Sequence, residues 1–196
     1  MKTTRSLFLG AVAALLALPA AAAPITWTID TAHAVAGFTV KHLSVTKVRG
    51  ELGAVTGTVI YDAADPTKSS IDATIDVKGV TTHNDGRDKH LNSPDFFDTA
   101  KFPTATFKST SVTKAGDGKL TVVGNLTLHG VTKPVTLAVE GPAAEQAHPM
   151  MKGTFVSAFS ATTTIKRKDF GVSYGPDAMV SDDVQVELDI EVDRKG

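Results

Sequence analysis

TTHNDGRDKHLNSPDFFDTAKFPTATFKS, residues 81–109, lies between segments rich in Val, Ile and Thr, which are typical of β-strands. Its first half is densely charged and its second half holds four phenylalanines. The charged half does not suit a buried strand, and the whole stretch is too short for a domain. Ser93 and Pro94 suit a helix start, as N-cap and first helical residue. We therefore expect one or two short helical turns that close an end of a β-barrel, with Phe96 and Phe97 facing its interior.

Alternating apolar and polar residues dominate the chain on both sides of this stretch. The pattern is clearest at the C-terminal end, where one face is wholly aliphatic and the other wholly polar, as in a wall with one wet side. Glycines 50, 53 and 57 interrupt another segment, and such glycines mark the bulges or bends of a closing barrel. We expect a short strand at 25–30 and eight long strands at 34–42, 48–61, 71–78, 104–112, 120–128, 131–141, 153–165 and 184–193.

The connections between these segments are short and mostly of the hairpin kind. We expect turns at 62–69 and 115–118, and a two-residue turn at His129 and Gly130. Pro134 suits an edge, a bulge or a strand start better than a central position. The pattern predicts an all-β fold, an antiparallel eight-stranded β-barrel with a short helical closing segment, wide enough for a small ligand. A two-sheet sandwich is the competing architecture.

Residues 1–22 have the pattern of a secretory signal peptide. A positively charged start precedes the apolar run from Leu7 to Leu18, and three alanines follow it. The run is shorter than the roughly 20 residues that a membrane span needs. We expect cleavage after Ala22 and export to a periplasm, with residues 23–196 forming one barrel domain.

Composition excludes several classes of protein. The formal net charge of the 196 residues is −1, so no overall field attracts nucleic acid or an anionic membrane. The absence of cysteine excludes disulfides, thiolate chemistry, iron–sulfur clusters and Cys-ligated zinc. The core alone must therefore hold the exported chain together. A domain of about 150 residues can do so, because it buries around 70% of its unfolded surface.

The ionisable residues offer weak evidence for catalysis or metal binding. His83, His90, Asp85 and Asp88 can be pictured as a metal site, but we favour an ion-pair network with Arg87 that fixes the closing segment. We expect no metal site. No G-x-S-x-G elbow and no glycine-rich phosphate loop is present.

Two further histidines lie close to a predicted barrel strand. His33 and His42 flank the strand that contains Phe38, and they can reach the interior from there. We interpret them as buried or rim histidines bonded to backbone rather than as catalytic groups.

Aromatic residues carry the binding hypothesis. The phenylalanines are more numerous than a tight barrel needs, so we expect some to fill the core and others to line a tunnel. The candidate apolar ligand-binding residues are Phe38, Val40, Phe96, Phe97, Phe102, Phe107, Phe155 and Phe159. At the barrel mouth, a polar headgroup would meet Asn84, Arg87 and His90, with Arg167 as a weaker candidate. In the alternative interpretation, Arg87 pairs with Asp85 or Asp88 and touches no ligand.

The sequence resembles the YceI-like family of periplasmic lipid-binding (polyisoprenoid-binding) proteins over nearly all of residues 23–196. Each motif is weak alone, but together and in order they are specific. The motifs are WTIDTAH at 27–33, FTVKH at 38–42, Asn84, RDKHL at 87–91, SPDFFD at 93–98, Phe102-Pro103, FKS at 107–109, GNLTLHGVTKPV at 124–135 and RKDFG at 167–171. Ala34 departs from the family, which usually has Ser there, and this affects a polar contact and not the fold.

This resemblance implies a lipocalin-like antiparallel barrel with a long apolar tunnel and without a metal site. Family members hold a prenyl chain, a quinone tail or a fatty amide. We therefore expect a soluble periplasmic carrier of such a hydrophobic lipid, with no enzymatic activity, no cofactor and no nucleic-acid partner. Transient membrane contact and a homodimer are left open. The alternatives are an enzyme that acts on such a lipid and a stress-related periplasmic protein that binds other proteins.

Overall fold

The computed structural model describes residues 23–196, so the predicted signal peptide lies outside the described residues. The strands are β1 (Ile25–His42), β2 (Thr46–Glu51), β3 (Val55–Tyr61), β4 (Ser70–Asp76), β5 (Thr104–Gly116), β6 (Lys119–Leu128), β7 (Val131–Glu140), β8 (Gln146–Ala147), β9 (Thr154–Lys166) and β10 (Asp183–Lys195). The helical elements are the α-helix α1 (Asp85–Leu91) and the 3-10 turns η1 (Pro66–Lys68) and η2 (Arg167–Phe170). Within residues 23–196, no helix has the length and apolar content needed to cross a membrane.

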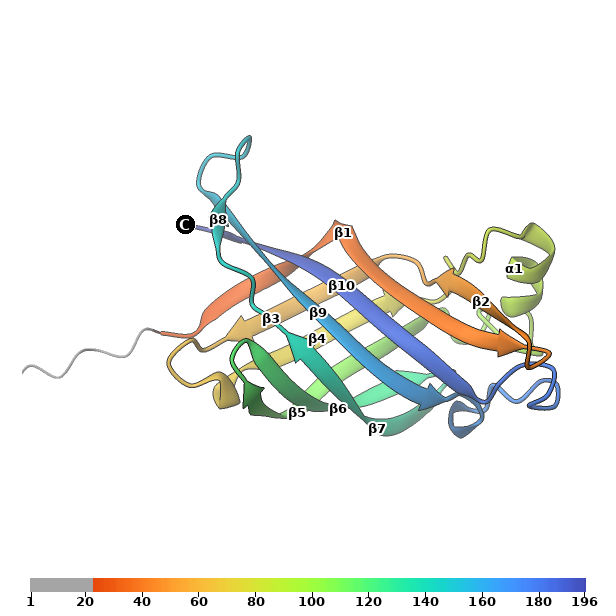
Figure 1. Cartoon of the computed structure of the whole chain (residues 1–196). Coiled ribbons are helices and arrows are strands. Elements are labelled where there is room, and N and C mark those ends of the chain that lie inside the picture. The colour runs from red at the N-terminus through yellow and green to blue at the C-terminus, as the bar shows by residue number, and fades with distance from the viewer. Residues whose placement is uncertain (1–22) are drawn as a thin grey trace, which may run out of the picture.

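Eight strands form a closed antiparallel barrel, which confirms the predicted fold class and excludes the sandwich. The order around the ring is β10-β1-β3-β4-β5-β6-β7-β9, and β9 closes the ring by pairing with β10 (Figure 1). The other two strands are additions: β2 pairs with β1, and the two-residue β8 pairs with β9. Helix α1 lies at one end of the barrel, and the loop between β8 and β9 extends at the other (Figure 1).

Strand β1 is continuous, although the sequence predicted two strands there. A register shift against β10 between Ile29 and Ala34 marks a bulge. Strand β1 pairs with β3 before this bulge and with β2 after it. The segment 48–61, predicted as one strand, is correspondingly divided into β2 and β3. Gly53 lies at the division, where a Cβ atom would sit 3.0 Å from the Cα of Gly79, so the close approach of the two backbones requires glycine.

The inner faces of the strands supply the core. In β10 the aliphatic face points inward as predicted, and Val192 is completely buried. Its partners in one buried cluster are Trp27, Ile29, Ala36, Val55 and Val59. The larger cluster comprises Val77, Ala105, Phe107, Val112, Leu120, Val122, Leu128, Val135, Leu137, Val139, Ala161 and Phe170. Because each strand has solvent on one side and apolar core side chains on the other, polar and apolar residues alternate along it with a period of two.

The predicted turn between β6 and β7 is confirmed. His129 and Gly130 have φ angles of 52° and 73°, as a two-residue hairpin turn requires. Pro134 was expected at an edge, a bulge or a strand start, and the structure places it where one edge of β7 is unpaired. Strand β7 pairs with β9 only over Ala138–Glu140, so at Pro134 the edge of β7 opposite β6 has no strand partner within the described chain.

A short helix does lie in the closing segment, but its predicted start at Ser93 was wrong. Asn84 is the N-cap of α1, and its side-chain Oδ1 accepts a hydrogen bond from the backbone N–H of Arg87 at 2.9 Å. The Ser93 hydroxyl donates instead to the carbonyl of His90 at 2.8 Å, just beyond the last helical turn. Ser93 therefore helps to end this helix, and the turns after it carry Phe96 to the barrel.

Candidate ligand cavity

Two apolar cavities lie inside the barrel. The central cavity has a volume of about 110 Å³, and the end cavity, on the side of α1, has a volume of about 120 Å³. Both are lined by Ile165 and Val186, so they are neighbours along the barrel. The other residues of the central cavity are Ile29, Val55, Val59, Ile71, Ala73, Phe107, Leu126, Val135, Leu137, Val139, Phe159, Ala161, Thr163, Leu188 and Ile190. Those of the end cavity are Ala36, Gly37, Phe38, Val40, Leu52, Leu91, Phe96, Phe97, Leu128, Arg167, Val172, Val180 and Val184.

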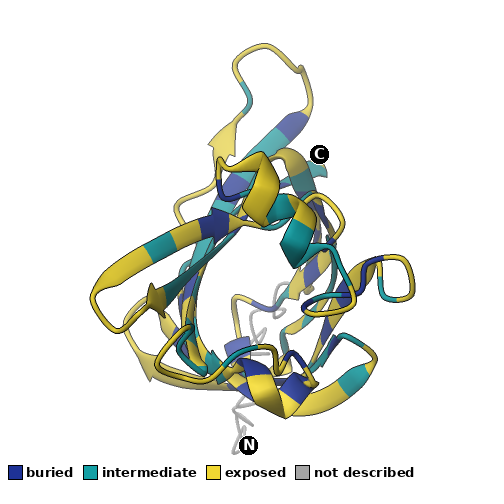
Figure 2. Ribbon diagram, turned by 90° about the vertical axis from the view of Figure 1, so that its right-hand side faces the viewer, coloured by how far each residue is buried: buried dark blue, intermediate teal, exposed yellow. Residues whose placement is uncertain are grey.

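The closing segment covers the end cavity. Leu91, from the last turn of α1, lines it together with Phe96 and Phe97. Phe96 is buried and packs against Tyr174, with ring centroids 5.1 Å apart. His90 lies edge-on to both rings, with centroid distances of 5.0 Å. This aromatic contact joins the closing segment to the loop after β9. Figure 2 looks at the barrel from this end.

The structure places six of the eight apolar candidate residues on the cavity linings. Phe38, Val40, Phe96 and Phe97 line the end cavity, and Phe107 and Phe159 line the central one. The remaining two lie outside both linings. Phe102 packs edge-on against His129, with centroids 4.7 Å apart, and Phe155 lies 4.5 Å from the guanidinium carbon of Arg194.

The polar candidates Asn84, Arg87 and His90 also lie outside both linings. Arg87 is exposed, and its Nε and Nη2 donate to the hydroxyl and the carbonyl of Thr82 at 2.6 and 2.9 Å. In the part of the chain that the structure describes, no carboxylate pairs with Arg87, so the expected ion-pair network is wrong. His90 pairs instead with Asp95, Nε2 to Oδ2, at 2.9 Å.

Asp88 fixes the start of the closing segment through hydroxyl and backbone donors. It accepts from the Thr82 backbone N–H at 2.8 Å, from the Thr82 hydroxyl, and from the Thr81 hydroxyl at 3.2 Å. Partial burial acts to raise the pKa of Asp88, but these hydrogen bonds outweigh it, and the pKa lies below its usual value. Thr82 thus links Asp88 to Arg87, and the link is structural.

Arg167 is the one ionisable residue on the two linings, and it is fully engaged. The residue is 5% exposed, and its guanidinium donates five hydrogen bonds to backbone carbonyls. The acceptors are Ser181, Val172, Tyr174, Gly175 and Val180, at 2.8 to 3.3 Å. A guanidinium has five N–H donors, so none remains for a headgroup. Arg167 holds the loop after β9 against the barrel, a role that sequence reasoning missed.

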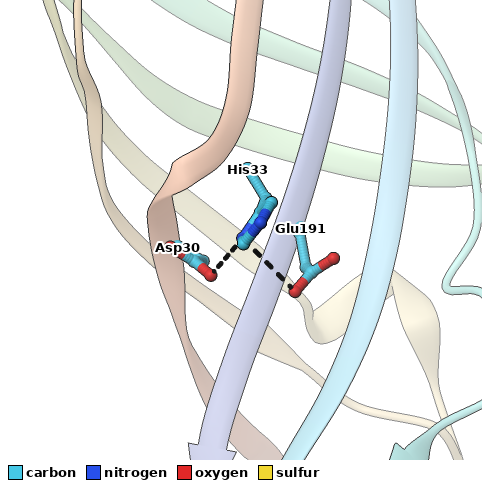
Figure 3. Close-up of side chains that lie close together, drawn as sticks. All are labelled: Asp30, His33 and Glu191. Carbon is cyan, nitrogen blue, oxygen red and sulfur yellow. Dashed lines mark hydrogen bonds and ion pairs between the residues drawn. The ribbon is translucent and has the colours of Figure 1, made fainter. Parts of the chain in front are cut away.

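Neither histidine expected near the interior reaches it. His42 is exposed, and His33 lies on the outer wall with 65% of its side chain exposed (Figure 3). His33 Nδ1 is 2.8 Å from Asp30 Oδ2 and 3.9 Å from Glu191 Oε1. The hydrogen bond to Asp30 raises the pKa of His33 and lowers that of Asp30.

The three groups of Figure 3 have a local structural role. Their ligand atoms lie within 4.8 Å of one another, a spacing that a divalent cation can bridge. However, Asp30 already pairs with His33 and accepts a hydrogen bond from the backbone of Ala32 at 2.9 Å. These contacts stabilise the bulge of β1, and we assign them that role.

The arrangement of a closed barrel around apolar cavities coincides with a match to a known domain family. The YceI-like domain matches residues 27–192. The chain belongs to the YceI-like family. A UPF0312 protein of Vibrio vulnificus is 38% identical to it over 193 residues, 97% of this chain and 99% of that protein.

Two solved structures of similar proteins have the same fold. BcnA of Burkholderia cenocepacia is 26% identical, with a TM-score of 0.72 over 83% of this chain and 98% of that one. A polyisoprenoid binding domain from Saccharophagus degradans is 19% identical, with a TM-score of 0.59 over 85% of this chain and 97% of that one. At that identity the second likeness shows the fold alone.

Proposed function

We propose that this YceI-like protein is a periplasmic carrier that binds one long apolar chain, such as a polyisoprenoid, a quinone tail or a fatty amide, inside its barrel. The observation that carries the proposal is the pair of neighbouring apolar cavities within a closed wall. A linear hydrocarbon fits two cavities in line better than a compact ligand does. The name of the Saccharophagus neighbour, a polyisoprenoid binding domain, supports the same class of ligand.

The energetics suit loading and unloading. Burial of one methylene group is worth about 0.8 kcal/mol relative to water, so a chain of many carbons has a large gross driving force to leave water. A bilayer solvates the same chain about as well as the barrel does. The net free energy of transfer between bilayer and barrel is therefore small, and the protein can release what it takes up.

The polar groups around the cavities support binding over catalysis. On the two linings, Arg167 is the only ionisable side chain, and its donors are all bound to backbone carbonyls. An enzyme acting on the lipid needs a positioned acid, base or nucleophile near the reacting atom. His33 and His42, the candidates for that role, lie outside the barrel. The cavity is instead suited to hold a chain without changing it.

The test is extraction of the protein purified from the periplasm of the organism that makes it. The extract in organic solvent is analysed by mass spectrometry, and the expected result is a stoichiometric long-chain lipid. A matched sample of the Val186→Phe variant, which narrows the junction of the two cavities, should carry less of it. Absence of any lipid from the natural protein, together with failure to take up geranylgeraniol in solution, would refute the proposal. Turnover of the added alcohol would favour the enzyme.

A further inference from the structure

The β1–β2 hairpin projects from the barrel at the end where α1 lies (Figure 1). Strand β2 pairs along its length with β1, and its other edge makes only the bridge from Glu51 to Thr81 among the described residues. The turn at its tip, Leu43–Val45, is tied to the loop after β9, because the backbone N–H of Leu43 donates to the carbonyl of Met179 at 2.9 Å. The hairpin tip and this loop therefore form one surface.

That surface exposes large apolar side chains. Leu43 is 56% exposed and Val45 84%, and Tyr174 and Met179 on the adjoining loop are also exposed. Leu43 and Ser44 have φ angles of 50° and 60°, in the left-handed region that is unfavourable for residues other than glycine. The fold thus presents a leucine to solvent on an unfavourable backbone conformation. Apolar side chains on such a tip gain free energy when they enter the boundary between lipid headgroups and acyl chains.

The outer face of the same hairpin carries three cations near the tip and one carboxylate, Glu51, at the end of β2 away from the tip. Lys41 lies directly opposite Lys47 in the β1–β2 register, and Arg49 is on the same face, opposite Thr39. Like charges on directly opposed residues destabilise a pair of strands in water. Within the described chain, no carboxylate lies within ion-pair distance of these three cations. The carboxylate in the adjacent groove, Asp183, is already bonded to Lys166 at 2.9 Å.

We propose that the hairpin tip docks on the surface of an anionic bilayer. Leu43 and Val45 enter the headgroup boundary, and Lys41, Lys47 and Arg49 meet the negatively charged headgroups. The formal net charge is −1 for the whole chain and −3 once Lys2 and Arg5 are lost with residues 1–22. This charge does not oppose the contact, because the attraction falls off within a Debye length and depends on the local cluster. Each cation near an anionic surface strengthens binding about fivefold.

Docking in this orientation brings the end cavity to the bilayer. The inner face of the hairpin carries Phe38 and Val40, which line that cavity, while the tip and the outer face touch lipid. This consequence for loading rests on the proposed carrier function, whereas the docking itself does not. The two ideas therefore fail separately: a protein that docks but takes up no lipid would refute only the carrier.

Vesicle co-sedimentation tests the docking. The protein is purified from the host that exports it, its N-terminus is identified by mass spectrometry, and it is mixed with vesicles of phosphatidylcholine with or without phosphatidylglycerol. We expect binding to the anionic vesicles that weakens as salt is raised. The double variant Leu43→Ser, Val45→Ser should bind the anionic vesicles at least about tenfold more weakly than the natural protein. The double variant Lys41→Ser, Lys47→Ser should bind about 25-fold more weakly and lose most of the salt dependence.

The matched control is Met150→Ser. Met150 is 88% exposed, and it lies in the loop between β8 and β9 at the opposite end of the barrel (Figure 1). This variant should bind vesicles as the natural protein does. All variants should have the melting temperature of the natural protein and still take up geranylgeraniol in solution, since none of the changed residues lines either apolar cavity of the barrel.

Three results would overturn the proposal. The first is equal binding to neutral and anionic vesicles, and the second is binding that is lost in Met150→Ser and kept in the tip variants. The third is the absence of binding to the anionic vesicles. If the protein is then a dimer that the tip variants dissociate, this surface is a contact between two copies of the chain.

Discussion

Val186→Phe tests whether the barrel interior is the binding site. Val186 lines both cavities, and its neighbour Glu187 points outward and is exposed. Phenylalanine has four more side-chain heavy atoms than valine, so it displaces about four ligand carbons from the junction. At about 0.8 kcal/mol per buried methylene, the loss is about 3 kcal/mol, or roughly a 200-fold rise in the dissociation constant for a chain that crosses the junction.

The assay measures geranylgeraniol binding in solution by calorimetry, with thermal melts on the same samples. Glu187→Phe is the control, because it adds a ring at the next residue but outside the wall. The control should bind as the natural protein does. A folded Val186→Phe protein with unchanged affinity would show that the ligand does not occupy the junction of the two cavities, and the reasoning from their alignment would be wrong.

Three further predictions concern stability and titration. Leu188→Asp places a carboxylate on the lining of the central cavity and should lower the free energy of unfolding by about 3 kcal/mol or more. Urea titration followed by circular dichroism measures this change, and a loss below about 1 kcal/mol would mean that water reaches this face. Arg167→Met leaves five backbone carbonyls without their donor and should lower the free energy of unfolding by about 3 kcal/mol or more. Amide hydrogen exchange over residues 172–181 should become faster, and unchanged exchange there would contradict the role of Arg167 in holding this loop. In NMR titrations, His33 should have a pKa above its usual value of 6.5, and this pKa should fall in the Asp30→Asn variant. Because the pKa is raised in the folded state, the contribution of His33 to stability is present below pH 6.5 and is lost as the pH rises through the folded-state pKa. The lowered pKa of Asp30 gives the opposite pH dependence: its contribution to stability is present above pH 3.8 and is lost as the pH falls through the folded-state pKa. A His33 pKa that does not change in Asp30→Asn would refute the pairing of the two residues.

The strands could be predicted from the sequence because each has one solvent-exposed face and one apolar face. In β10 every second residue points to the interior, so Val186, Leu188 and Ile190 appear in the sequence as an uninterrupted alternation. Glycines 50, 53 and 57 indicated a bend in the next segment, but they did not show that β1 changes partner there. Gly79, which Gly53 approaches closely at this division, is distant in sequence and is brought near only by the fold.

The position of the helix was not readable from capping residues alone. Both Asn84 and Ser93 are good N-caps, and Pro94 favours the second. The fold uses Asn84 because Thr82 and Thr81 bind Asp88 and hold the first turn of the helix in place. These contacts depend on the backbone conformation and not on residue spacing.

The cavity was only partly readable for a related reason. Phe38 and Phe107 were expected on the linings and lie there, but an inward aliphatic residue looks the same in sequence whether it borders a cavity or fills a core. Arg167 could not be assigned as a brace, because its partners are backbone carbonyls, which any sequence can supply. The predicted contacts of Asn84, Arg87 and His90 with a headgroup stay predictions.

The wall of the barrel is held together unevenly. Strand β9 pairs with β10 along the whole of Asp183–Lys195, but it pairs with β7 only over Ala138–Glu140. Opening of a sheet starts where the fewest hydrogen bonds must break, so amide protons along this junction should exchange before those of the rest of the ring. For the proposed carrier function, we expect a guest molecule too long to leave through the end of the barrel to leave sideways between β7 and β9.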